Sequence, residues 1–103
     1  MFKLKPNPTF FAPVEISVPG EAEPAKFEVE FKHKSASDLH AYFSNLSGRT
    51  DADALAEVIA GWRGVDVPYS AEALADLLNN YPVSAMELFT AYRRELLESR
   101  RKN

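Results

Sequence analysis

The sequence predicts an α+β protein in which an N-terminal antiparallel β-hairpin or small sheet packs on about four short C-terminal α-helices. Before residue 35, apolar residues alternate with polar ones, which is the period of a half-buried strand. After residue 35 they recur three and four residues apart, as on one face of a helix. A length of 103 residues suits one core. We therefore expect residues 1–103 to be a single domain, with the β part at about 1–34 and the helical part at about 35–100.

Two strands form the predicted β unit at residues 12–34, after a short extended piece at residues 3–5. Every second residue of the first strand is apolar: Ala12, Val14, Ile16 and Val18. Pro13 lacks an N–H, so it belongs near a strand start or on a sheet edge. Turn formers and charges fill residues 19–24, and the second strand then alternates again, with an apolar face of Phe27, Val29 and Phe31. Two such strands joined by a short polar loop predict an antiparallel hairpin.

The first two helices are predicted within residues 35–64. Ser35 and Thr50 each precede an apolar stripe and can cap a helix start. The first stripe, which stops at Ser47 and Gly48, contains Leu39, Tyr42, Phe43 and Leu46. The second contains Leu55, Val58, Ile59 and Trp62. We expect this second helix to continue to a C-terminal stop at Gly64.

Two more helices follow. Ser70 can cap the third, Pro82 closes it, and its apolar side contains Leu74, Leu77, Leu78 and Tyr81. Ser84 and Glu87 have the spacing of a capping box at the start of the last helix. The apolar stripe of that helix contains Leu88, Tyr92 and Leu96, broadened by Ala85 and Phe89. Its end is basic, which is favourable near the negative end of a helix dipole, and carries Arg93, Arg94, Arg100, Arg101 and Lys102.

Aromatic residues exceed what so small a core needs, with seven Phe, four Tyr and one Trp. The core that we expect contains Val14, Ile16, Phe27, Val29, Phe31, Leu55, Ile59 and Leu78. Phe10 and Phe11 are adjacent and cannot both face the same side of a strand. Phe89 and Tyr92 make the last stripe wider than one short helix needs for docking. These four are candidate partner-binding residues, and the alternative is that they are ordinary core.

No pattern of catalytic or metal-binding residues is present. The two histidines, His33 and His40, lack the three or four converging ligands of a metal site, since Asp38 does not face His40 on a helix. No serine lies in a G-x-S-x-G motif, and Gly61 and Gly64 lack the spacing of a phosphate loop. There is no cysteine, which removes disulfides and thiolate chemistry. We therefore expect no enzymatic activity, no cofactor and no bound metal.

Net charge and hydropathy indicate whether this protein could bind nucleic acid or span a membrane. The net charge of −3 weighs against binding to nucleic acid, because such proteins normally present a basic face. The basic C-terminal cluster is the best candidate for such a contact, but we favour a solvated helix end, since no aromatic platform accompanies it. No stretch approaches the ~20 apolar residues that a membrane span requires. The residues after the first Met do not form the apolar run of a signal peptide.

Several segments together resemble the tail assembly chaperones of long-tailed bacteriophages (siphoviruses) and their prophages. The resemblance covers nearly the whole chain and contains no catalytic signature. It is carried by KLKPNPTF at residues 3–10, the strand at 27–34 leading into Asp38-Leu39, IAGWRGV at 59–65 followed by Tyr69-Ser70, LLNNYP at 77–82, and RRKN at 100–103.

The resemblance implies a specific role. Such chaperones coat the long, hydrophobic tape measure protein in the bacterial cytoplasm, keep it soluble, help to recruit tail tube subunits, and are absent from the finished virion. Many copies line one client, which implies self-association. Some members also exist in a longer form made by ribosomal frameshifting. Short amphipathic helices are compatible with this role, because they can present a groove for a helical client.

Two other classes of function remain open from the sequence. One is a small structural tail or head-completion protein that stays in the virion. The other is a small regulatory adaptor or nucleic-acid binder that uses the basic C-terminal helix. Retention in purified virions would distinguish the first from a chaperone, and salt-sensitive DNA binding would support the second.

Overall fold

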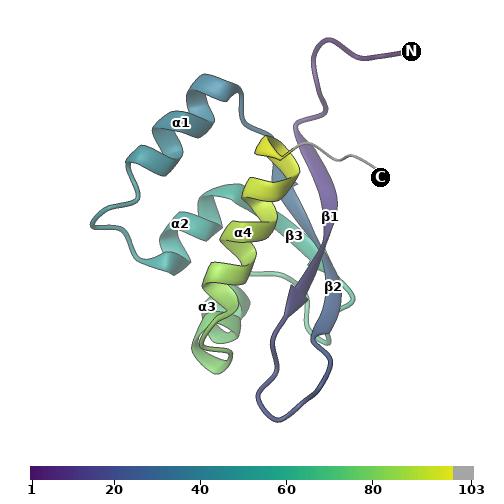
Figure 1. Cartoon of the computed structure of the whole chain (residues 1–103), viewed down its shortest axis with the longest axis vertical. Helices are drawn as coiled ribbons and strands as arrows, with labels where there is room; N and C mark the ends of the chain where they lie inside the picture. Colours follow the sequence, from purple (N-terminus) through teal and green to yellow (C-terminus); the bar gives the residue numbers. More distant parts are fainter. Residues whose placement is uncertain (99–103) are drawn as a thin grey trace.

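The computed structural model describes residues 1–98, and it confirms the α+β class. Its helices lie to one side of an antiparallel sheet, with α4 next to β1 (Figure 1). The chain traces in order β1 (Thr9–Ile16), β2 (Ala25–Lys32), α1 (Ala36–Ser44), α2 (Asp51–Val58), β3 (Ile59–Arg63), α3 (Ala71–Asn80) and α4 (Ser84–Leu97).

The predicted hairpin is confirmed as β1 and β2. The two strands pair antiparallel, with Phe10 opposite Phe31 and Val14 opposite Phe27. The alternation places Ala12, Val14 and Ile16 in the core, while the residues between them face outward. Strand order in the sheet is β1-β2-β3, so Pro13 lies on an edge strand, where its missing N–H leaves no ladder bond unmade.

The prediction of the second helix is wrong for its last turn. Helix α2 ends at Val58, and Ile59–Arg63 forms β3, which pairs antiparallel with β2. Ile59 is β-branched, Trp62 is aromatic and Gly61 costs a helix about 1 kcal/mol, so the local preference for a helix was weak here. The segment forms a strand because it pairs with β2. Ile59 is buried as expected, but it reaches the core from a strand rather than from a helix.

Three of the four expected caps are confirmed. The side-chain oxygens of Ser35, Thr50 and Ser70 each accept a hydrogen bond from the backbone N–H three residues later. Gly48 follows α1 with a φ of +82°, a left-handed conformation that a glycine adopts without steric cost. Gly64, expected to stop a helix, has a φ of +87° and turns the chain after β3 instead.

The capping box predicted for α4 does not form. The N-cap is Val83, whose side chain makes no capping hydrogen bond. The Ser84 hydroxyl instead donates to the carbonyl oxygen of Leu77 at 3.4 Å. The Glu87 carboxylate points instead at the end of β1, where it accepts from the Ser17 N–H at 3.0 Å and the Ser17 hydroxyl at 2.6 Å. A tertiary contact therefore replaces the local one, and it anchors α4 to the sheet.

The core joins the sheet to the helices, as expected. Of the eight expected core residues, six are fully buried: Val14, Ile16, Val29, Phe31, Leu55 and Ile59. Phe27 and Leu78 are only partly buried, against the prediction. Phe27 lies at the end of the sheet, where it meets Trp62 edge-on, and in α3 only Leu74 is completely enclosed.

The segment before β1 does not join the sheet. Residues 3–5, expected to be a short extended piece, form no strand, and the start of the chain leads away from the body (Figure 1). Pro8 still contacts the body, because its carbonyl accepts from the His33 N–H at 2.9 Å. Phe2 and Leu4 retain 87% and 88% of their exposed surface. The predicted basic residues Arg100, Arg101 and Lys102 lie outside the described residues.

We predict that Phe31→Ala lowers the free energy of unfolding by roughly 3–5 kcal/mol, because it leaves a cavity in the most enclosed part of the core. Urea titration followed by circular dichroism measures this value. The matched control is Phe11→Ala on the outer face, expected to cost about 1 kcal/mol or less. Equal losses in the two variants would contradict the assignment of the sheet faces.

Candidate protein-binding surfaces

Phe10 and Phe11 lie on opposite faces of β1, as their adjacency requires. Phe10 is half-buried, with its ring centroid 5.9 Å from that of Phe31. Phe11 is 42% exposed on the outer face of the sheet. The guanidinium of Arg63, from β3, lies 3.9 Å from the centre of the Phe11 ring, within cation–π range. Of this pair, Phe11 is the more exposed, while Phe10 lines a pocket with Pro6 and Leu96.

Charged side chains surround Phe11 on the outer face. Nε of Arg63 donates to Oε1 of Glu28 at 2.8 Å, and this hydrogen bond lowers the pKa of Glu28. The Thr9 hydroxyl donates to the Glu30 carboxylate at 2.7 Å. The three strands thus present one aromatic ring among paired charges, a surface suited to a polar contact.

Phe89 and Tyr92 also differ in their exposure. Tyr92 is fully buried, and its hydroxyl donates to the backbone carbonyl of Lys32 at 2.8 Å. Phe89 is half-buried and faces α1 across a groove. The four aromatic residues singled out from the sequence therefore do not converge on one surface.

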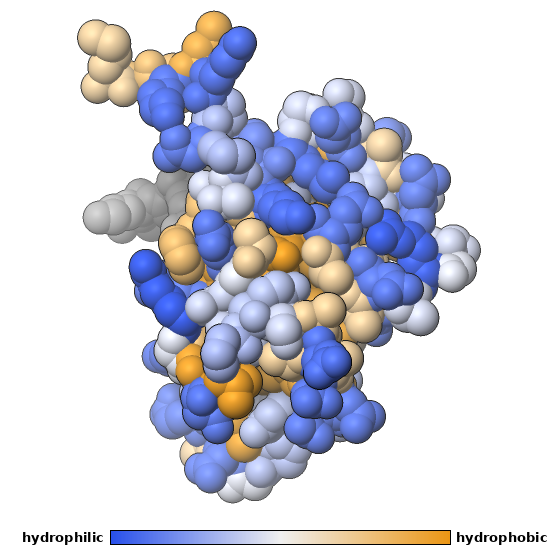
Figure 2. Space-filling view, turned by 180° about the vertical axis from the view of Figure 1, so that it is seen from behind, coloured by the Kyte–Doolittle hydropathy of each residue, from blue (hydrophilic) through white to orange (hydrophobic). Residues whose placement is uncertain are grey.

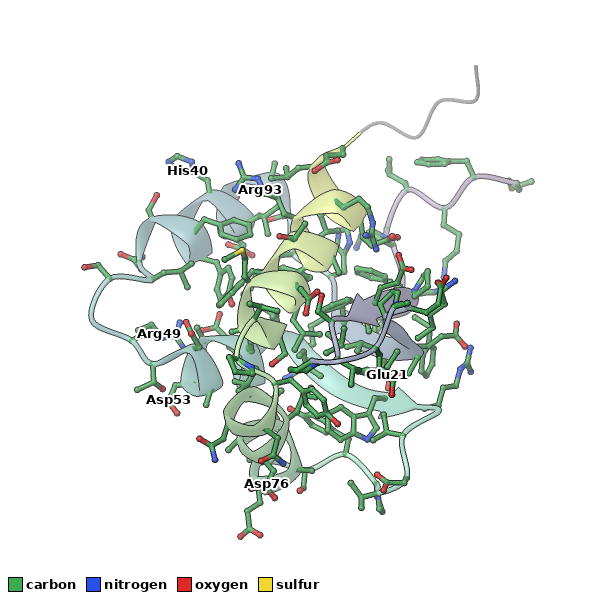
Figure 3. All side chains as sticks on the ribbon, turned by 60° about the horizontal axis from the view of Figure 1, so that its bottom comes forward. Glu21, His40, Arg49, Asp53, Asp76 and Arg93 are labelled. Carbon is green, nitrogen blue, oxygen red and sulfur yellow. The ribbon has the colours of Figure 1, made fainter. Side chains whose placement is uncertain are left out.

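The groove beside Phe89 has a volume of about 350 Å³, and we call it the α1–α4 groove. Its apolar lining is Phe43, Leu46, Ala85, Met86 and Phe89. Met86 is 68% exposed, a large fraction for an apolar side chain. The groove carries opposite charges, Asp51 from α2 and Arg93, whose guanidinium lies 5.2 Å from the Phe43 ring centre. Figure 3 shows Arg93 on the α1 side of α4.

A second groove, which we call the sheet-end groove, lies where the strands meet α3 and the loop after β3. Its volume is about 470 Å³, and its apolar lining includes Ile16, Phe27, Trp62, Val65, Leu77 and Tyr81. Asp66 and Asp76 also line it, and both are exposed. Seen from behind, apolar residues gather at this lower end of the molecule (Figure 2).

Sequence reasoning missed the sheet-end groove because it placed Trp62 on a helix. In the structure Trp62 meets Phe27 and Tyr69 edge-on, with ring centroids 6.1 and 5.1 Å apart. Its indole N–H donates to the carbonyl of Val67 at 2.9 Å and holds the following loop. The sequence did contain a signal for this strand, since Ile59 and Trp62 favour strands and Gly61 disfavours a helix.

On the remaining face, an ion-pair network connects Glu57 of α2 to the segments on either side of α1. The Glu57 carboxylate lies 3.0 Å from Lys34 Nζ and 2.8 Å from an Arg49 nitrogen. These two hydrogen bonds lower the pKa of Glu57. Nearby, the buried Tyr42 hydroxyl donates to the carbonyl of Ala54 at 2.6 Å, and burial raises the pKa of Tyr42 to about 12. This face holds the helices together and has no apolar opening comparable to the two grooves.

Within residues 1–98, no three His, Cys, Asp or Glu side chains gather in an arrangement that could hold a metal ion. His40 is exposed on α1, and His33 follows the end of β2. Among the same residues, no helix has the length and hydropathy needed to cross a membrane. What the described surface offers is therefore the two apolar grooves, a further pocket of about 410 Å³ where Pro6, Phe10 and Leu96 meet, and one charged sheet face.

A family model described as phage tail assembly chaperone matches residues 1–103. No curated protein and no solved structure matches.

We predict that Tyr42→Phe makes stability less sensitive to alkaline pH. A folded pKa above the ordinary value of about 10 means that the unfolded chain loses this proton first, so stability falls as pH rises from 10 towards 12. Between pH 7 and pH 11 the titration of Tyr42 should lower the free energy of unfolding of the wild type by about 1 kcal/mol. The variant lacks this hydroxyl and should not show that loss. Urea titrations at pH 7 and pH 11 measure both proteins, and equal losses would contradict the prediction.

Proposed function

Because this chain belongs to the phage tail assembly chaperone family, we propose that it binds the tape measure protein of a long-tailed phage and keeps it soluble until tail tube subunits assemble around it. Family membership implies a non-enzymatic role in tail assembly. The tape measure protein as client, the recruitment of tube subunits and the host cytoplasm as the place of action are parts of this proposal.

The observation that carries the proposal is the α1–α4 groove. A client helix that is apolar along one side can lie in such a groove with residues at i, i+3, i+4 and i+7 as anchors. Met86 and Phe89 supply the contact, and Met86 is mostly exposed in the free protein. A methionine side chain is flexible and polarisable, so it can fit many different apolar partners along a repetitive client. Moderate affinity for many sites is what a reversible coat needs.

The charges that flank the groove support one orientation of the client. Asp51 favours the positive N-terminal end of a docked helix, and Arg93 favours its negative C-terminal end. The contact of Arg93 with Phe43 keeps this cation beside the groove. A client helix would therefore run with its N-terminus towards α2.

For the tube subunits we propose the outer face of the sheet, where Phe11 is the exposed aromatic. This face is polar apart from Phe11 and Pro13 and lies across the sheet from the helices, so a tube subunit and the client could bind together. Of the alternatives, a structural protein kept in the virion predicts that the chain copurifies with finished particles, whereas the proposed chaperone is absent from them.

We predict that Met86→Asp and Phe89→Ala each reduce the amount of soluble tape measure protein on co-expression. Each change removes apolar contact from the groove, and a central contact of this type is expected to contribute more than about 1 kcal/mol, or roughly fivefold in affinity. The measurement is the soluble fraction of the tape measure protein of the same genome, with and without each variant.

The matched control is Leu97→Ser, which alters another exposed apolar residue of α4 outside the groove. Circular dichroism and thermal unfolding confirm that each variant is folded. If the client is equally soluble with and without the wild-type protein, the chaperone proposal fails. If all three variants behave like wild type, the client binds elsewhere.

A further inference from the structure

Two charged side chains of the α1–α4 groove have no partner of opposite charge within residues 1–98. Asp51 and Arg93 both line the groove and are exposed, and neither takes part in an ion pair of the described chain. On the neighbouring face, by contrast, Glu57 neutralises both Lys34 and Arg49. The described groove therefore combines an apolar lining with one anion and one cation that are each available to a partner.

These two charges lie towards opposite ends of the groove. Along α4 the lining residues run from Ala85 to Arg93, eight residues apart, which corresponds to about 12 Å of helix. Asp51 is the first residue of α2, and Figure 1 shows α2 beside the N-terminal half of α4 and α1 beside its C-terminal half. Figure 3 likewise separates Arg93 from the start of α2, where Asp53 is labelled. The two charges therefore do not neutralise each other.

Each charge is held in place by the structure around it. The Arg93 guanidinium lies 5.2 Å from the centre of the Phe43 ring, within cation–π range. Asp51 follows the cap residue Thr50 in the first turn of α2, where the positive end of the helix dipole favours a carboxylate. A side chain that is already positioned loses less conformational freedom when it binds. An ion pair with a partner therefore costs little ordering on this side of the contact.

A client helix that lies along α4 can meet both charges with one face. Positions i, i+3, i+4 and i+7 of a helix share a side, and the rise from i to i+7 is about 10.5 Å, close to the length of the groove. Charged residues at i and i+7 would reach Asp51 and Arg93, while apolar residues between them contact Met86 and Phe89. Because the two groove charges have opposite sign, the best client carries opposite charges as well.

Resting on the proposed function, we propose that the α1–α4 groove selects its client segments by their charge pattern. The preferred segment is a helix with a basic residue opposite Asp51, apolar residues three and four positions later, and an acidic residue at the seventh position, opposite Arg93. Binding then takes place at discrete sites of the client that carry this pattern, rather than along every apolar helix.

The test measures the affinity of the full chain for three labelled amphipathic peptides by fluorescence anisotropy, each about 20 residues long so that it can form a helix. They share leucines at i+3 and i+4 and differ only at i and i+7, which are Lys with Glu, Lys with Lys, or Glu with Glu. Wild type should bind the Lys–Glu peptide about fivefold more tightly than either other peptide, since one attractive pair otherwise becomes repulsive. Raising the ionic strength from about 0.05 M to about 0.5 M should reduce this preference.

Charge reversal in the protein should exchange the preferences. Arg93→Glu should favour the Lys–Lys peptide and Asp51→Lys the Glu–Glu peptide, each about fivefold over the Lys–Glu peptide. The matched control is Asp76→Lys, at an exposed helical aspartate outside this groove, which should keep the wild-type order. Circular dichroism confirms that each variant is folded, and the gain of one peptide as another is lost distinguishes a charge effect from damage to the fold.

Met86→Asp separates the charge pattern from the groove itself, because it should abolish binding of all three peptides. If wild type binds the three peptides equally and Met86→Asp abolishes this binding, the groove remains the client site and the charge pattern is wrong. If no peptide binds, or if Met86→Asp keeps the wild-type affinities, the α1–α4 groove is not the client site, and the proposed function loses its groove as well.

Discussion

Tyr92 of α4 joins the parts of this fold that the chain itself keeps far apart. Its ring lies 5.1 Å from Phe31 of β2 and 6.1 Å from Tyr42 of α1, measured between centroids. Its hydroxyl donates to the carbonyl of Lys32, so the ring is fully buried without an unpaired polar group. Burial also raises the pKa of Tyr92, which keeps the hydroxyl a neutral donor. Sheet, first helix and last helix therefore share one packed contact.

Because α4 is held at its centre by Tyr92, its two sides have different roles. One side reaches the edge strand β1, where Arg94 bonds to Pro13 and Glu87 bonds to Ser17. This covers a strand edge that could otherwise pair with another chain. The other side leaves Met86 and Phe89 beside α1, in an apolar groove. Helix α4 therefore covers the sheet edge with polar contacts on one side, while apolar residues on its other side line a groove.

The two grooves differ in their lining and in their charges. The α1–α4 groove is lined by the exposed Met86 and flanked by charges of opposite sign, Asp51 and Arg93. The sheet-end groove is lined by the edge-on rings of Phe27 and Trp62, and Asp66 and Asp76 are also in its lining.

The sequence by itself determined the features that depend on near neighbours in the chain. The β-hairpin, the three side-chain caps at Ser35, Thr50 and Ser70, and the core faces of β1 and β2 follow from period and from local hydrogen bonding. The family resemblance also followed from the sequence, and the family model agrees with it. Surplus aromatic residues were visible as well, but their number could not show which of them face water.

Only the tertiary structure decided the features that depend on distant partners. Ile59–Arg63 became a strand because β2, about 30 residues earlier, offered an unpaired edge, and Glu87 left its own helix end to bind Ser17. The same holds for the candidate surfaces: Tyr92 is core and Phe89 lines a groove, although both lie on one predicted stripe. The physical reason is that periodicity shows which side of an element is apolar. It does not show whether a neighbouring element covers that side.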